Sequence, residues 1–113
     1  MQDLISWFFE SLKQAAREIL KDPTRVYSIT LGGANAKRML FLISAGILDY
    51  ARTFLKKRFG IDAIITYVSR LEVINSLYIL VADRRYYKRA KDLIKQVRNQ
   101  LNIYTMQSFE YIV

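Results

Sequence analysis

Apolar residues recur at helical spacing near the start of the chain, and the pattern changes to alternation after residue 24. The apolar positions on one side of the first predicted helix, residues 3–21, are Ile5, Phe8, Phe9, Leu12, Ala16 and Ile19. Asp3 precedes them as a candidate N-cap, and Pro23 should end the helix because it disfavours helical backbone at the residue before it. The stretch RVYSITL, residues 25–31, alternates and is rich in β-branched and aromatic residues, which predicts a strand.

A long helix is predicted from Gly33 to Phe59, because the pair Gly32-Gly33 breaks the strand. Its apolar residues form two faces: one with Leu40, Ile43, Ile47, Tyr50 or Ala51, and Phe54, and a second with Phe41, Leu48 and Leu55. A helix that is apolar on two sides needs two surfaces to pack on. We expect one to be the sheet and the other to be the N-terminal helix or a second protein. Cations at residues 56–58 suit the helix dipole, and Gly60 is a candidate C-terminal cap.

Two further strands are predicted at residues 61–70 and 76–83, joined as an antiparallel hairpin. Asp83 is a candidate N-cap for a last helix, whose apolar residues recur at helical spacing as far as Leu101, and a final strand follows to the C-terminus. From Arg25 the order is therefore β-α-β-β-α-β. This is the ferredoxin-like arrangement, a four-stranded antiparallel sheet with two helices on one face. The residues expected in its core include Ile29, Ile43, Ile79, Leu93, Ile94 and Val97.

One α+β domain over residues 1–113 is predicted, in which an N-terminal amphipathic helix, residues 1–22, precedes a ferredoxin-like core, residues 25–113. The sequence allows two positions for the N-terminal helix. We expect it either to cover the bare face of the sheet or to pack beside the other helices on the opposite face.

The amino-acid composition excludes most kinds of catalytic site. The chain has no cysteine and no histidine, which excludes disulfides, zinc-thiolate sites and Ser-His or Cys-His nucleophiles. Its acidic residues form no DxD or ExxE pair, so we expect no metal, no cofactor and no enzyme activity of the chain alone. The N-terminus lacks signal-peptide features, and the longest uncharged run, residues 39–48, is about half of a bilayer span. We therefore expect a cytoplasmic protein without a membrane partner, and the abundance of Lys, Arg and Tyr is typical of a thermophile.

The positive charge is concentrated in the last predicted helix. Residues 84–98 carry seven basic side chains and one acidic one, in a chain of net charge +8. The basic positions that form one stripe opposite the apolar row are Arg84, Lys88, Lys91, Lys95 and Arg98. Such a row can pair with nucleic-acid phosphates and release their counterions. The alternative is a solvated helix face on which Lys88 and Lys95 both reach Asp92.

Two further features are compatible with a nucleic-acid role. Lys37 and Arg38 lie in the first turn after the glycine pair, where free backbone amides can hold a phosphate. The alternative at this place is a tight turn that needs glycine. The tyrosines on predicted strands are Tyr67, Tyr78 and Tyr111. Their rings either stack on unpaired bases or belong to the core and to interfaces.

Several segments occur together in an order that a known family shares. They are the strand RVYSITL, the long helix ending in Phe59-Gly60, the stretch SLYILVADRRYYKRAKDLIKQV that leads from strand to helix, and a closing strand. Over residues 25–113 the chain thereby resembles the small ferredoxin-like protein subunit of archaeal and eukaryotic ribonuclease P. The resemblance implies a noncatalytic subunit that contacts RNA and a protein partner in a transfer-RNA-processing particle.

The leading prediction is a basic protein that binds RNA, or nucleic acid more broadly, within a larger complex. The residues expected to neutralise phosphates are Arg84, Lys88, Lys91, Lys95 and Arg98, with Lys37 and Arg38 helping. The alternative is a protein-interaction or dimerisation module without a nucleic-acid role, such as a viral or plasmid-borne archaeal protein. Its partner, another protein or a second copy, would contact the surplus apolar surface of the N-terminal and long helices.

Overall fold

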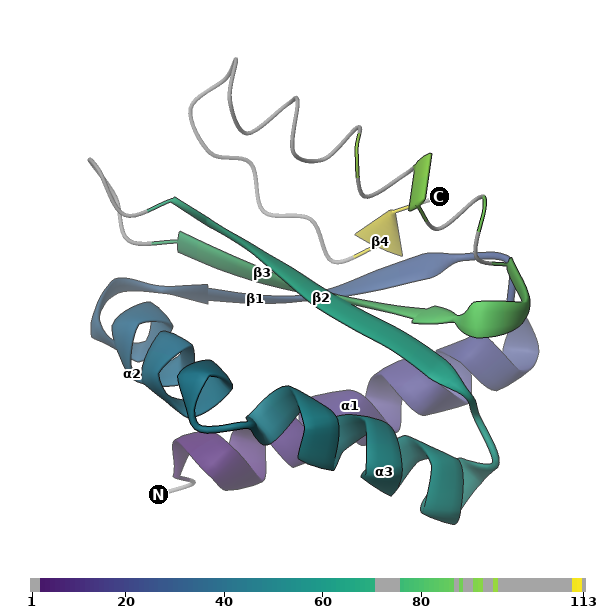
Figure 1. Cartoon of the computed structure of the whole chain (residues 1–113), viewed down its shortest axis with the longest axis horizontal. Coiled ribbons are helices and arrows are strands. Elements are labelled where there is room, and N and C mark those ends of the chain that lie inside the picture. The colour runs from purple at the N-terminus through teal and green to yellow at the C-terminus, as the bar shows by residue number, and fades with distance from the viewer. Residues whose placement is uncertain are drawn as a thin grey trace.

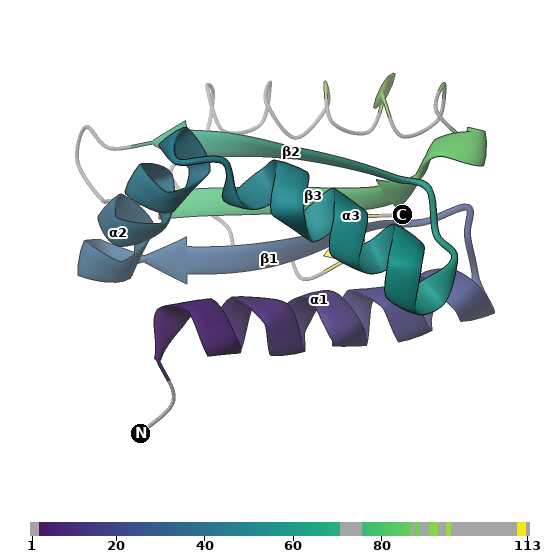
Figure 2. The same cartoon turned by 60° about the horizontal axis from the view of Figure 1, so that its bottom comes forward.

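The structure, a computed structural model, describes residues 3–70, 76–86, 88, 91, 92, 95 and 111–112. In chain order its elements are α1 (Leu4–Lys21), β1 (Val26–Gly32), α2 (Gly33–Ser44), α3 (Ile47–Phe59), β2 (Ala63–Arg70), β3 (Ser76–Asp83), a 3-10 turn (Arg84–Tyr86) and β4 (Tyr111–Ile112). The helices α1, α2 and α3 lie together on one face of an antiparallel sheet (Figure 1 and Figure 2). None of the helices in this part of the chain is long and apolar enough to cross a membrane.

The helix α1 forms where the sequence predicts it. Oδ1 of Asp3 accepts a hydrogen bond from the backbone N–H of Ser6 at 2.8 Å, which confirms the predicted N-cap. The predicted apolar side is buried at Phe8, Leu12, Ala16 and Ile19, whereas Ile5 is 48% exposed. Because the sheet and α3 cover the middle and end of α1, the apolar surface around Ile5 is left in contact with solvent.

The predicted single helix over residues 33–59 is wrong, because the chain breaks between α2 and α3. Gly46 adopts a left-handed conformation with φ 100°, and the N–H of Ala45 is shared between the carbonyls of Phe41 and Leu42. The break gives the two helices different directions (Figure 2). The residues that point into the core are then Ala36 and Met39 from α2 and Leu48, Ala51 and Leu55 from α3. The two apolar faces predicted for one helix are therefore only partly correct. Ala51, Leu48 and Leu55 are buried, whereas Tyr50 and Phe41 are 69% and 74% exposed. The remaining predicted positions, Leu40, Ile43, Ile47 and Phe54, are partly buried.

The strand β3 lies at the centre of the sheet. It pairs antiparallel with β1, with Ile79 opposite Ile29, and with β2, with Val81 opposite Ile65. All eight of its residues are buried. Alternation along the strand places Ile79 and Val81 in the core under the helices, and Tyr78 on the other face, where it is only 1% exposed. The sheet is thus covered on both faces around β3.

The six residues predicted for the core have different outcomes. Ile29 and Ile79 are buried as predicted, and Ile43 is partly buried at the margin of the core. Leu93, Ile94 and Val97 lie outside the described residues.

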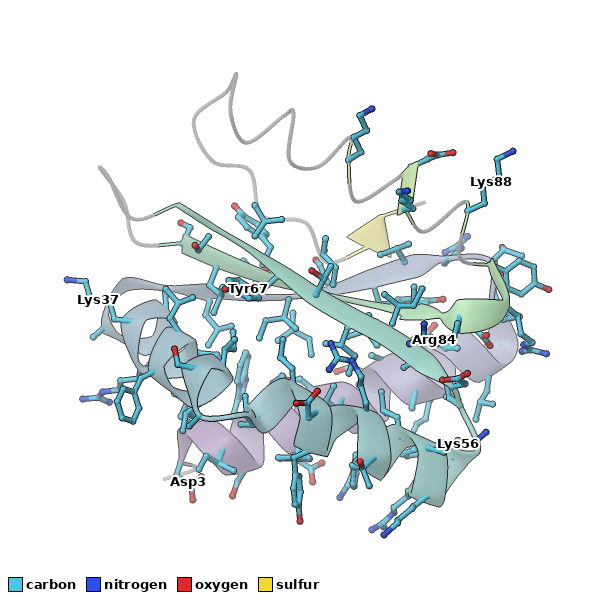
Figure 3. The ribbon with its side chains drawn as sticks, in the orientation of Figure 1. Asp3, Lys37, Lys56, Tyr67, Arg84 and Lys88 are labelled. Atoms are coloured by element: carbon cyan, nitrogen blue, oxygen red, sulfur yellow. The ribbon has the colours of Figure 1, made fainter. Side chains whose placement is uncertain are left out.

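The prediction of a ferredoxin-like sheet of four strands with two helices on one face is contradicted. Within the described residues the sheet has three long strands in the order β1-β3-β2, and β4 adds only two residues, paired with Val26 and Tyr27. The helical layer contains three helices. The reason is that α1, with a buried apolar stripe, packs beside α3 as part of that layer, whereas Lys88 of the predicted last helix lies on the other side of the sheet (Figure 3). The remainder of the predicted last helix and last strand lies outside the described residues.

Candidate nucleic-acid interface

Six carboxylates of the described residues each hold one basic side chain within ion-pair distance. The pairs are Glu10–Lys13, Glu18–Lys21, Asp22–Arg25, Asp49–Arg52, Asp62–Arg84 and Asp83–Arg85. Hydrogen bonds from Lys13 and Arg85 lower the pKa of Glu10 and of Asp83 below their ordinary values. Most of the described acidic side chains are therefore neutralised by a basic neighbour. The surface is positive where basic side chains outside these six pairs lie close together.

Three segments of the chain meet at one end of the molecule: the last turn of α3, the start of β2 and the end of β3. They meet because β2 and β3 are antiparallel, with Ala63 opposite Asp83. Arg84 fixes this junction, since its backbone N–H donates to the carbonyl of Asp62 at 2.9 Å and its Nε donates to Oδ1 of Asp62 at 3.2 Å. Figure 3 shows Lys56, Arg84 and Lys88 at this end. We call the cations at this end of the molecule the basic end: Lys56, Lys57, Arg58, Arg84, Arg85 and Lys88.

The last turn of α3 supplies three exposed cations to the basic end, Lys56, Lys57 and Arg58. Gly60 ends the helix with φ 68°, and its N–H donates to the carbonyl of Lys56 at 3.0 Å, which confirms the predicted C-terminal cap. No carboxylate of the described residues lies within ion-pair distance of these three side chains. The sequence alone does not assign them a binding role, although three consecutive bases are a signal for one. The fold brings them to the same end of the molecule as Lys88, which lies on the other side of the sheet (Figure 3).

The predicted basic stripe is described at four of its five positions. Arg84 is half exposed and bound to Asp62, so part of its charge is already compensated. Lys88, Lys91 and Lys95 have helical backbone and exposed side chains, as a phosphate-binding row requires. Arg98 lies outside the described residues.

Asp83 caps the start of the same segment. Its Oδ1 accepts from the backbone N–H of Arg85 at 2.9 Å, as predicted for an N-cap, and its other oxygen accepts from Nη2 of Arg85 at 2.7 Å. The carboxylate is 3% exposed, while the Arg85 side chain is 71% exposed. Asp83 thus acts as a buried anchor that fixes Arg85 at the surface.

Lys37 and Arg38 do not join the other predicted bases. Both are exposed on α2, and Lys37 lies at the end of the molecule opposite Arg84 and Lys88 (Figure 3). The longest Cα dimension of the protein is 38 Å. The two predicted groups are therefore separate surfaces.

The glycine pair before α2 forms a tight turn. Gly33 has φ 60°, a conformation that favours glycine, and the N-cap Gly32 supplies no side-chain hydrogen bond. A cavity of about 810 Å³ lies beside this turn, between β1, α2 and the start of α1. Arg38 and Asn35 line it together with Trp7 and Asp3, and Lys37 does not. The acidic side chain of Asp3 makes this cavity less favourable for a phosphate than the glycine turn alone predicts.

The tyrosines on the strands divide between core and surface. Tyr78 is buried, and desolvation raises the pKa of its phenol, so its ring is not accessible for stacking on a base. Tyr67 is 39% exposed. The side chain of Tyr111 lies outside the described residues. In the described part of the chain there is also no cluster of three or more acidic, histidine or cysteine residues that could hold a metal ion.

Comparison of the chain with protein family models, with curated proteins and with solved structures gives no match.

Proposed function

We propose that the chain is a noncatalytic nucleic-acid-binding protein that holds the phosphate backbone of RNA at the basic end and along Lys91 and Lys95. The observation that supports this most is the gathering of exposed cations at one end of the molecule, with residues 56–58 on the helix side of the sheet and residue 88 on its other side (Figure 3). No carboxylate of the described residues lies within ion-pair distance of these side chains. Like charges gathered at one end of a protein repel each other, and a polyanion that runs across that end relieves the repulsion.

The chemistry of this surface favours binding that depends little on base sequence. Lysine ammonium groups on flexible stems act as point charges toward phosphates, and each contact releases condensed counterions. Tyr78, the aromatic residue at the centre of the sheet, is buried, so the sheet offers no central ring for stacking. Affinity should therefore come from phosphate contacts and should fall steeply with salt.

RNA in preference to DNA is proposed from the sequence resemblance to the ribonuclease P subunit over residues 25–113. A role in a transfer-RNA-processing particle and a cytoplasmic location belong to the same proposal. The three-helix layer differs from the ferredoxin-like arrangement that the resemblance implies, so the support comes from the residue pattern and the charge. The alternative function, a protein-interaction module, is favoured by one separate observation, the exposure of Phe41 and Ile5 at the other end of the molecule.

The test is a binding titration against fluorescently labelled single-stranded RNA, double-stranded RNA and duplex DNA of equal length over a range of salt concentrations. Replacing Lys88, Lys91 and Lys95 together by glutamine removes about three phosphate contacts, so the slope of log affinity against log salt should become shallower by about 2 to 3. The fold should persist, because the three side chains are exposed. An unchanged slope would remove this row from the proposed interface, and absence of binding to all three probes at low salt would refute the function.

A further inference from the structure

An apolar groove lies between the start of α1 and α2, at the end of the molecule away from the basic end. Its volume is about 550 Å³, and its apolar walls are Leu4, Ile5, Phe41 and Leu42. Phe41 is 74% exposed and Ile5 is 48% exposed, although both are large apolar side chains. Asp3, which also lines the groove, lies at the same end as Lys37 (Figure 3).

The fold itself creates this surface. The break at Gly46 lets α2 turn Met39 into the core, which leaves Phe41 on the outer side. α1 covers α3, where the ring of Phe9 contacts that of Phe54 at 5.1 Å between centroids, but it does not cover Phe41. The sequence predicts a second packing surface for the helical region at residues 33–59. α1 provides this surface for α3, but no element of the described residues covers Phe41 on α2.

The charged residues of the groove are complementary to each other but do not pair within one chain. Asp3 and Arg38 both line the groove, and they are not within ion-pair distance of each other. Both oxygens of Asp3 accept hydrogen bonds from Ser6 on the same helix. A surface with one acid, one base and an apolar centre is complementary to its own copy, because a two-fold axis brings the acid of each chain to the base of the other.

We propose that two copies of this chain form an isologous dimer through this groove. The exposed ring of Phe41 packs against the groove of the partner copy, and Arg38 of each copy pairs with the partner's Asp3. An acidic side chain and an apolar floor suit a nucleic acid poorly, whereas they suit a second copy well. Because the basic end lies at the other end of each chain, the dimer presents two basic ends that point apart. The inference does not rest on the proposed nucleic-acid function.

The first experiment is sedimentation velocity of the purified full chain over a concentration series up to about 1 mM, which covers weak dimers. Wild-type protein should show a reversible monomer–dimer equilibrium. Phe41→Ala should raise the dissociation constant by about 30-fold or more, the effect of removing a central aromatic residue from an interface. Tyr50→Ala is the matched control, because Tyr50 is 69% exposed on α3 and does not line the groove, so the dimer should be unchanged. A monomeric wild type up to the highest concentration, or equal effects of the two substitutions, would overturn the proposal.

The second experiment tests the ion pairs directly. Arg38→Glu and Asp3→Lys should each abolish the homodimer, because each places like charges across the two-fold axis. An equimolar mixture of the two variants should form a heterodimer, since one native pair and one reversed pair are then restored. Thermal unfolding of each variant identifies any loss of fold. If Asp3→Lys destabilises the helix that Asp3 caps, the loss of the homodimer in Arg38→Glu alone tests the ion pair. Dimerisation of Arg38→Glu with unchanged affinity, or a mixture of folded variants that stays monomeric, contradicts the proposal.

Discussion

Replacing Gly46 by alanine gives opposite results for the broken helix of the structure and for a continuous helix over residues 33–59. In the structure Gly46 has φ 100°, and a Cβ added there meets no atom within 4 Å. The penalty is therefore backbone strain without a steric clash, about 1–2 kcal/mol for a left-handed residue with a side chain. In a continuous helix the same substitution would stabilise the protein by about 1 kcal/mol, because alanine is the better helix former.

The assay is urea unfolding followed by circular dichroism, with the free energy of unfolding extrapolated to water. Gly46→Ala should lower this free energy by about 1–2 kcal/mol. Gly46→Asn is the matched control, because asparagine tolerates the left-handed conformation better than alanine does, so it should lose less. An increase in stability for Gly46→Ala would refute the break between α2 and α3, and with it the argument that leaves Phe41 exposed.

Two further predictions concern the core and the anchor at the end of β3. Leu12→Ala should lower the free energy of unfolding by about 2–5 kcal/mol, because Leu12 is buried. Leu20→Ala on the same helix should change it by only about 0.5 kcal/mol, because the Leu20 side chain is 60% exposed. Equal losses for the two variants in urea unfolding would contradict the packing of α1. The Arg85 hydrogen bond lowers the folded-state pKa of Asp83, so this carboxylate contributes stability that is present above its unfolded pKa and is lost as the pH falls through the folded value. Asp83→Asn should therefore reduce the loss of stability in acid, as measured by thermal unfolding from neutral to acid pH. Identical acid profiles for Asp83→Asn and wild type would rule out this contribution.

The strands could be predicted from the sequence because their signal is local. Alternation and β-branched residues indicated residues 25–31, 61–70 and 76–83, and the structure has strands at Val26–Gly32, Ala63–Arg70 and Ser76–Asp83. The helix break could not be predicted in the same way, since a single glycine is tolerated inside a helix and the residues around Gly46 are compatible with one. Only packing of Met39 and Leu48 into the same core requires the change of direction.

The candidate site, too, could be predicted from the sequence only where its residues are close together along the chain. The stripe at Lys88, Lys91 and Lys95 is visible in the sequence because its residues are neighbours on one helix. The contribution of Lys56 and Lys57 is not, because these residues are far from Lys88 in the sequence. They reach the same end of the molecule only through the antiparallel pairing of β2 with β3.

The salt dependence of RNA affinity for the double variant Lys56→Gln with Lys57→Gln decides whether the end of α3 takes part in phosphate binding. If the two segments form one phosphate-binding surface, the slope of log affinity against log salt for single-stranded RNA should become shallower by about 1.4, or about 0.7 for each lost contact. The control variant Lys37→Gln removes an exposed charge at the opposite end of the molecule (Figure 3), and it should leave the slope unchanged. Equal slopes for wild type and both variants would contradict phosphate binding at the basic end, because the end of α3 would then take no part in it.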